Sequence, residues 1–314
     1  MNSEVAQFKT PIVLIIFNRP QHTERVFRRI AEMRPTRLLI IADGPRASRP
    51  GEAILCESAR EVVRQISWPC EVSTNFSEYN LGCRDRVISG LNWAFSEVEE
   101  AVVLEDDIFP DPSFFRFCEE MLDRFRSDAR VSMVTGFNIV QDRSPKDTSY
   151  FFSHLTHIWG WATWQRSWAR YDEQLKDWPK IKASGEMGNL FEDPKQYRFW
   201  ERIFDQMHAG TGPNTWDYQW VYTNFINNAL SIVPKVNLIE NIGFGPEATH
   251  TKQVAHAPTV STTSLQFPLL HPPAIIPLRD LDKLDGERSK FRLPTLVQRV
   301  WGKIRRTLRT PEAR

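Results

Sequence analysis

Four short segments in the first third of the chain that are typical of strands limit the folds that it can adopt. They are residues 11–17 (PIVLIIF), 37–44 (RLLIIADG), 70–76 (CEVSTNF) and 101–105 (AVVLE). The last run lacks polar alternation, which is typical of a strand buried on both faces of a sheet. Segments with helical periodicity alternate with these runs, over residues 17–33, 52–67, 84–98 and 114–125. The alternation predicts an α/β fold with a mostly parallel, Rossmann-like sheet flanked by helices.

Three adjacent carboxylates, Glu105, Asp106 and Asp107, follow the fourth apolar run. In open α/β sheets the ligand crevice lies outside the carboxyl ends of the strands, so we expect these acids at a ligand-binding edge. Adjacent carboxylates raise one another's pKa unless a positive group neutralises them, and hard divalent cations prefer oxygen ligands. The triplet therefore indicates a metal site. The alternative, acids that cap the next helix, explains Asp111 but leaves the triplet unexplained.

Composition bounds the class of protein. The chain has 314 residues, of which 41% are hydrophobic and 12% aromatic, enough for one large α/β domain or two smaller ones. The formal net charge of +1 gives no reason to expect a nucleic-acid partner. Four cysteines without CxxC spacing suit a reducing compartment, so we expect a cytoplasmic protein. The longest apolar run, PIVLIIF, is far shorter than the roughly 18 residues of a membrane span, and we expect neither a signal peptide nor a transmembrane helix.

Tryptophans are concentrated in the second half of the chain. Trp161, Trp164 and Trp168 have helical spacing, which favours a buried helical stripe. Trp159 and Trp216 fit that stripe less well and are candidates for stacking on a sugar or nucleoside.

Taken together, the motifs resemble metal-dependent glycosyltransferases of the GT-A (nucleotide-diphospho-sugar transferase) fold, and most of all the N-acetylglucosaminyltransferase I family and its bacterial relatives. The diagnostic acidic motif of that family is similar to residues 105–108, EDDI. The resemblance extends in order over residues 11–250. It implies that Asp107 binds the metal directly, that Asp106 contacts the ribose or the donor sugar, and that Glu105 orients both.

The resemblance also implies contacts to the donor from four other stretches. IFNRP is similar to the end of the family's first strand, whose arginine contacts the nucleotide, and IIADG to the strand whose acid meets the uracil edge. The helix that begins RDR is similar to one that places a basic side chain near the diphosphate, and HIWGW to a segment beside the donor sugar. The residues implied by these matches are Arg19, Asp43, Arg86 or Arg84, Trp159, Gly160 and Trp161.

TWDYQW, residues 215–220, resembles the segment that holds the family's catalytic base, which implies this role for Asp217. The alternative for Asp217 is an acid in the first turn of a helix, stabilised by the helix dipole. A late histidine completes the metal shell in other GT-A enzymes, and His250 is a second candidate ligand although it has no clear counterpart in the family.

The resemblance implies an inverting glycosyltransferase that uses Mn²⁺ or Mg²⁺ and a UDP-sugar. It would transfer a hexose or N-acetylhexosamine to a glycan or lipid-linked acceptor in cell-envelope polysaccharide synthesis. A sugar-1-phosphate nucleotidyltransferase is an alternative, but it requires a glycine-rich loop after the first strand, where this chain has FNRPQH. A non-catalytic carbohydrate-binding protein would explain the tryptophans without explaining the acids.

The end of the chain differs in composition. We expect a GT-A domain over residues 1–278, a charged linker from residue 279 to 290, and a basic amphipathic helix over 295–309. Such a helix suits an anionic membrane surface, which would place the protein at the inner face of the membrane. The alternative is a helix docked on the domain with a solvated basic face.

Overall fold

The computed structural model describes residues 7–243 and 260–289. Its centre is an eight-stranded sheet in the order β3-β2-β1-β4-β8-β6-β9-β7. These strands are β1 (Ile12–Ile16), β2 (Arg37–Ala42), β3 (Glu71–Phe76), β4 (Glu100–Glu105), β6 (Val131–Thr135), β7 (Tyr150–Ser153), β8 (Trp161–Trp164) and β9 (Leu230–Pro234). The strands β3, β2, β1 and β4 are parallel to one another, as are β6 and β9, whereas β8 and β7 are antiparallel to their partners. The predicted α/β class, with a mostly parallel sheet, is confirmed.

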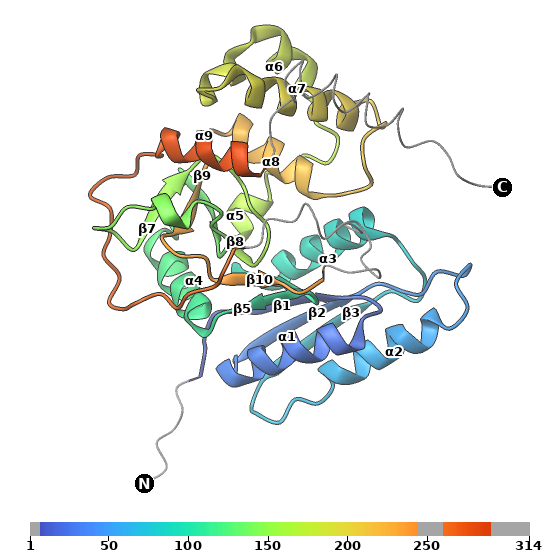
Figure 1. Cartoon of the computed structure of the whole chain (residues 1–314). Helices are drawn as coiled ribbons and strands as arrows, with labels where there is room; N and C mark the ends of the chain where they lie inside the picture. Colours follow the sequence, from blue (N-terminus) through green and yellow to red (C-terminus); the bar gives the residue numbers. More distant parts are fainter. Residues whose placement is uncertain (1–6, 244–259, 290–314) are drawn as a thin grey trace, which may run out of the picture.

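Helices cover both faces of the sheet (Figure 1). On one face, Ile12, Leu14 and Ile16 of β1 pack with residues of α1 (Pro20–Met33), α2 (Glu52–Val63) and α4 (Pro112–Arg124). On the other face, Val13 and Ile15 pack with α3 (Cys83–Glu97), α5 (Gln165–Trp168) and α8 (Asp217–Ile226). Because successive residues of β1 are buried on opposite sides, the strand has no polar alternation.

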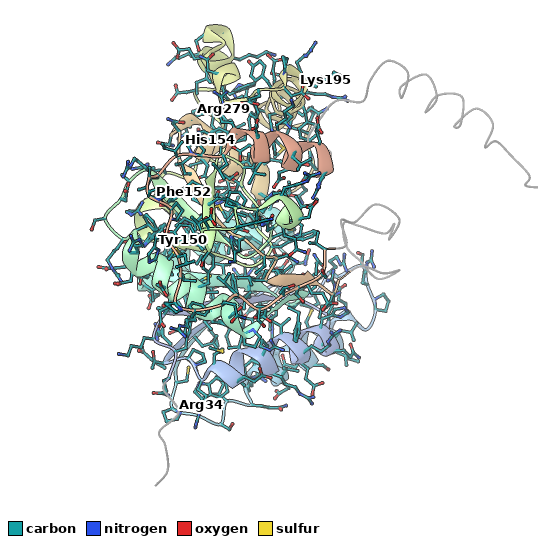
Figure 2. The ribbon with its side chains drawn as sticks, turned by 60° about the vertical axis from the view of Figure 1, so that its left-hand side comes forward. Arg34, Tyr150, Phe152, His154, Lys195 and Arg279 are labelled. Atoms are coloured by element: carbon teal, nitrogen blue, oxygen red, sulfur yellow. The ribbon has the colours of Figure 1, made fainter. Side chains whose placement is uncertain are left out.

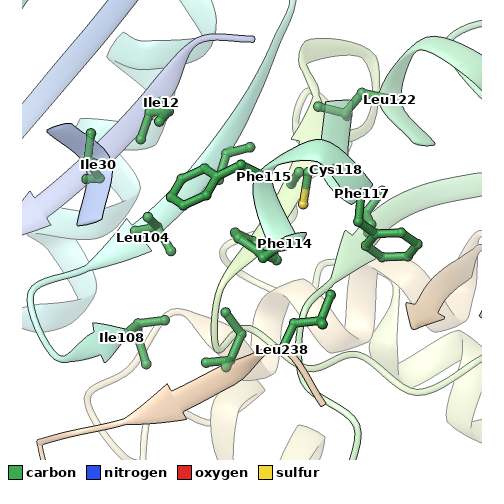
Figure 3. Packing of buried hydrophobic residues seen from close by; sticks show 14 of the residues in the cluster. Ile12, Ile30, Leu104, Ile108, Phe114, Phe115, Phe117, Cys118, Leu122 and Leu238 are labelled. Atoms are coloured by element: carbon green, nitrogen blue, oxygen red, sulfur yellow. The ribbon is translucent and has the colours of Figure 1, made fainter. Parts of the chain in front are cut away.

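Helix α4 shows how the chain closes over the first of these faces. Asp111 is its N-cap, as expected, and accepts a hydrogen bond from the Ser113 backbone N–H. Phe114, Phe115 and Leu238 are fully buried there (Figure 3). The short sheet of β5 (Ile108–Pro110) and β10 (Ile239–Asn241) lies next to this packing and ties residues 239–241 to the chain that follows the acidic triplet.

A helical lobe stands beyond the edge of the sheet that holds β7 and β9 (Figure 1). It contains α6 (Trp178–Ser184), η2 (Glu186–Leu190), α7 (Pro194–His208) and α9 (Arg279–Arg288), whereas η1 (Gln141–Arg143) connects β6 to β7. An aromatic cluster that includes Trp178, Trp200 and Phe204 joins α6 and α7 to α8. None of the helices in the described ranges is long and apolar enough to span a bilayer.

Two expectations about secondary structure are wrong. Trp161 and Trp164 lie in the strand β8 and only Trp168 lies in a helix, although all three are buried as expected. The segment from residue 279, expected to be a linker, forms α9 and packs beside β7, where the backbone N–H of Leu278 donates to the carbonyl of Phe152 (Figure 2). The expected amphipathic helix at 295–309 lies outside the described residues.

Candidate active site

A cavity of about 380 Å³ lies at the carboxyl ends of β1, β2 and β4. Its position matches the ligand crevice expected for an open α/β sheet. The charged residues that line it are Arg19, Asp43, Arg46, Arg86, Glu105, Asp106, Asp107 and Asp217. These are five acids and three arginines, so the lining carries a formal charge of −2 when all of them are ionised, which suits a ligand that brings a divalent cation.

The acidic triplet is held against the end of β1. The carboxylate of Asp106 accepts a hydrogen bond from the Phe17 backbone N–H at 3.2 Å. The guanidinium of Arg19 donates to Asp107, with 2.7 Å between Nη1 and Oδ2, and the same nitrogen lies 3.8 Å from Oδ1 of Asp106. Arg19 lies just after the end of β1 and is the N-cap residue of α1. Pro20 occupies the first position of that helix, where its fixed φ suits the start of a helix.

Among the described residues, the guanidinium of Arg19 brings one positive charge to three carboxylates. Burial, and then the neighbouring carboxylates, raise the pKa of Glu105 to about 8. Burial and the charge of Asp107 raise the pKa of Asp106 to about 7, against the opposing effect of Arg19. The cluster therefore favours the approach of further positive charge.

The oxygen atoms of Asp106 and Asp107 fit Mn²⁺ or Mg²⁺. Within residues 7–243 and 260–289, no group of three or more His, Cys, Asp or Glu side chains could hold a metal by itself. Ions of this kind are commonly bound by one or two carboxylates together with substrate phosphates, so the residues present fit a metal that arrives with a nucleotide. The other expected ligand, His250, lies outside the described ranges.

Asp43 lines the cavity, but both of its oxygens are already engaged. Oδ1 accepts from the backbone N–H groups of Gly44 and Leu81, and Oδ2 accepts from Asn80 Nδ2 and the Gly82 N–H, at distances between 2.8 and 3.0 Å. A Cβ at Gly44 would lie 2.5 Å from the backbone of Tyr79, so only glycine fits there. Asp43 thus joins the end of β2 to the loop before α3.

Of the two arginines expected near the diphosphate, one lines the cavity and the other does not. Arg86 lines the cavity, and its guanidinium donates to Asn75 at the end of β3. Arg84, the alternative candidate, pairs instead with Glu173 at the surface, and it is not among the lining residues. Sequence reasoning missed Arg46, which lines the cavity and is held by Glu52. Its only sequence signal is a basic side chain shortly after the carboxyl end of a predicted strand.

The remaining wall of the cavity carries the aromatic residues and Asp217. Trp159 lines it, with its ring centroid 4.8 Å from that of Phe137 in an edge-to-face contact. Trp216 also lines it, although it is almost fully buried by stacking on Trp161 at 5.7 Å. Asp217 opens α8 and accepts a hydrogen bond from the Thr215 hydroxyl.

Two residues of the expected donor-sugar segment do not line the cavity. Trp161 lies behind it with 1% of its surface exposed, because Trp216 covers it. Gly160 has a φ of +58°, and a Cβ at this position would lie 2.4 Å from Cδ1 of Ile239. Close packing against β10 accounts for this glycine without any contact to a sugar.

Comparison with known proteins gives weak likenesses only. No protein-family model and no curated protein matches the chain. Among solved structures, the mannosyltransferase PcManGT from Pyrobaculum calidifontis in complex with GDP-Man and Mn²⁺ is 12% identical over 70% of each chain, with a TM-score of 0.37. Apo mouse xyloside xylosyltransferase 1 is 11% identical over 68% of this chain and 81% of its own, with a TM-score of 0.35.

A third solved structure, 4-diphosphocytidyl-2C-methyl-D-erythritol synthase from Anaerococcus prevotii, is 12% identical over 53% of this chain and 77% of its own, with a TM-score of 0.32. None of the three is N-acetylglucosaminyltransferase I, so the predicted link to that family stays a prediction. Likenesses at this level support no activity for the chain, and its function must be inferred from the geometry of the cavity.

Proposed function

We propose that the protein is a metal-dependent glycosyltransferase that moves a sugar from a nucleoside-diphosphate donor to a hydroxyl of a glycan or glycolipid acceptor. One observation carries the proposal: a single cavity unites the groups that each part of the reaction needs. Asp106 and Asp107 suit a divalent ion, Arg19 and Arg46 suit a diphosphate, and Asp217 suits an acceptor hydroxyl.

The donor side requires groups that stabilise the leaving group. When the bond between the anomeric carbon and the phosphate oxygen breaks, negative charge develops on the nucleoside diphosphate. A divalent ion held by Asp107 and Asp106 would supply Lewis-acid stabilisation of that charge. Arg46 adds a fixed positive charge, because Glu52 and the face of Phe17 hold its guanidinium in place.

The acceptor side requires a base. The acceptor hydroxyl attacks the anomeric carbon, its proton passes to a carboxylate, and the nucleoside diphosphate leaves from the opposite face, which inverts the anomeric centre. Asp217 lines the cavity on a different element from the triplet, so it is our candidate for the base. Trp159, which is partly exposed in the same cavity, is our candidate for stacking on the donor sugar.

We favour a UDP-sugar that carries a hexose or N-acetylhexosamine. Since Asp43 already accepts four hydrogen bonds, we expect the loop that it holds, with Asn80 in the cavity wall, to contact the base.

A screen of nucleoside-diphosphate sugars tests the proposal, with Mn²⁺ or EDTA present and the released nucleoside diphosphate as the readout. We expect turnover with one class of donor and none in EDTA. A nucleotidyltransferase would instead consume a nucleoside triphosphate and a sugar 1-phosphate and release pyrophosphate, and this result would replace our proposal.

Membrane association is a separate part of the proposal. It is supported by the basic sequence at 295–309, where each Lys or Arg near an anionic lipid surface contributes about 1 kcal/mol. Removal of residues 291–314 should abolish sedimentation with anionic vesicles and leave donor turnover intact. Equal sedimentation of the full and the shortened chain would refute the association.

A further inference from the structure

Arg19 is paired with the acids that would hold the metal. Its Nη1 atom lies 2.7 Å from Oδ2 of Asp107 and 3.8 Å from Oδ1 of Asp106. All three side chains are largely withdrawn from solvent, with exposed fractions of 15% for Arg19, 19% for Asp107 and 11% for Asp106. At these carboxylate oxygens the guanidinium thus supplies the positive charge that a divalent ion would supply.

We infer that Arg19 is an exchangeable counter-ion: it neutralises Asp107 and Asp106 in the nucleotide-free protein and transfers to the diphosphate when metal and nucleotide bind. This inference rests on the proposed function. The two cations compete for the same carboxylate oxygens, and a guanidinium beside a divalent ion is repelled by it. The diphosphate is the anion that arrives with the ion, and arginine binds phosphate oxygens well.

The backbone of Arg19 is fixed while its side chain is long enough to change partners. The Arg19 carbonyl accepts hydrogen bonds from both the backbone N–H and the hydroxyl of Thr23, each at 2.9 Å. This contact locks the start of α1, so the exchange requires only a change of side-chain rotamer. The loss of the Asp107 contact is offset because the diphosphate, which is negatively charged like Asp107, gives the guanidinium a new partner.

Arg46 provides a matched comparison within the same cavity. It has the same charge, but it is held by Glu52 and not by the triplet, with Nε to Oε2 at 2.9 Å. Exchange therefore applies to Arg19 and not to Arg46. Both arginines should favour the nucleotide, but only Arg19 should oppose the metal.

The test measures Mn²⁺ binding by electron paramagnetic resonance, and UDP binding by calorimetry with and without Mn²⁺, for the wild type, Arg19→Gln and Arg46→Gln. Without nucleotide, Arg19→Gln should bind Mn²⁺ about tenfold more tightly, because the competing cation is gone. With saturating Mn²⁺, its affinity for UDP should fall about tenfold or more, because a charged hydrogen bond is lost. The factor by which each ligand strengthens the other should also decrease. Arg46→Gln should lose UDP affinity with a smaller change in Mn²⁺ affinity.

A second readout uses the wild type and does not depend on whether a variant folds. Guanidinium ¹⁵N signals, assigned with Arg19→Lys and Arg46→Lys, should show Arg19 shifting on addition of Mg²⁺ alone, and Arg46 shifting only when UDP is added.

Three results would overturn the exchange: weaker or unchanged Mn²⁺ binding by Arg19→Gln, equal gains in both variants, or an Arg19 signal that ignores Mg²⁺. These results differ from a failure of the proposed function, in which the wild type itself would bind UDP no better with Mn²⁺ than without it.

Discussion

Asp43 lines the cavity, yet both oxygens of its carboxylate already accept hydrogen bonds from other groups of the protein. Each oxygen accepts two hydrogen bonds, three of the four from backbone N–H groups and one from Asn80. A carboxylate oxygen has about two favourable acceptor positions, so both are filled. The position of Asp43 at the end of β2 was predictable from the sequence, whereas three of its four partners belong to a loop almost forty residues later.

Asp43→Asn should therefore act mainly on stability. An asparagine keeps one acceptor oxygen and turns an NH₂ group toward two donors, so two of the four hydrogen bonds that Asp43 accepts are lost. We expect the free energy of unfolding to fall by about 2–4 kcal/mol, measured by urea denaturation. A variant as stable as the wild type would show that the carboxylate is not required to hold the loop.

Glu105 makes the stability of the metal-free protein depend on pH. Its pKa is raised from the ordinary value of 4.5 to about 8, mainly by burial. Between these values the folded protein holds a proton that the unfolded chain has released, so this contribution to stability is present below 4.5 and is lost as the pH rises through 8. In EDTA, Glu105→Gln should melt close to the wild type at about pH 5 and above it at about pH 9. If the difference in melting temperature between Glu105→Gln and the wild type stays constant over this pH range, the raised pKa of Glu105 is contradicted.

Asp217→Asn separates a transferase from a protein that only binds nucleotide sugars. As a general base Asp217 acts on the acceptor, so the variant should keep its donor affinity while kcat falls about 10²–10⁴-fold. If Asp217 serves only as an acid at the start of α8, only a few tenths of a kcal/mol of stability should be lost through the helix dipole. Donor titration and initial rates on one preparation distinguish the two roles, and loss of less than about tenfold in rate would move the base to another carboxylate.

Among the elements of the fold, α9 is held by two buried acids, Asp282 and Asp285, which contact residues 153–157. Asp282 accepts hydrogen bonds from the Ser153 hydroxyl at 2.5 Å and from the His154 backbone N–H at 3.1 Å. Asp285 pairs with His157, whose ring lies in edge contact with Phe137, the neighbour of Trp159. The helix therefore buries two acids beside its partly buried Leu281 and Leu284, whereas most surface helices bury apolar side chains alone.

Asp282→Ala should destabilise the fold, and Asp280→Ala provides the control. Both acids lie in the first turn of α9, but Asp282 is buried and Asp280 is exposed. Removing Asp282 leaves buried donors without their acceptor, so we expect a loss of about 2–4 kcal/mol against less than about 0.5 kcal/mol for the control. Equal effects of the two substitutions in chemical denaturation would show that α9 is not anchored in this way.

The elements that the sequence predicts well are those whose signal is local. The strands around residues 12–16 and 101–104 are apolar on both faces, and this pattern alone indicates a central position in a sheet. Helix α9 is not predicted because its sequence, RDLDKLDGER, has only two apolar side chains that pack, Leu281 and Leu284, and its partners at residues 153–157 are about 130 residues away. Trp161 and Trp164 were assigned to a helix because their spacing fits one, while pairing with β4 and β6 holds them in a strand.

In the whole molecule, the fold brings together site residues from the first and the second half of the chain. The triplet at the end of β4 and Asp217 at the start of α8 are more than one hundred residues apart, yet both line one cavity. The sequence predicts both as site residues, but it leaves open whether Arg86 or Arg84 lies near the diphosphate. Arg84 and Arg86 are two residues apart on α3, so they point in different directions, and only Arg86 lines the cavity.

In the proposed reaction the acidic triplet binds a nucleotide through a divalent ion. Calorimetric titration of UDP into the wild type, Asp107→Asn and Asp85→Asn, each with Mn²⁺ and with EDTA, tests it most directly. Asp85 is an exposed acid of α3 outside the cavity lining, so its variant controls for the loss of one charge. We predict that Mn²⁺ strengthens UDP binding in the wild type and in Asp85→Asn, and that this gain disappears in Asp107→Asn while its melting temperature stays near that of the wild type. An Asp107→Asn variant with the full Mn²⁺-dependent gain, or a wild type whose binding is the same in EDTA, would contradict the account.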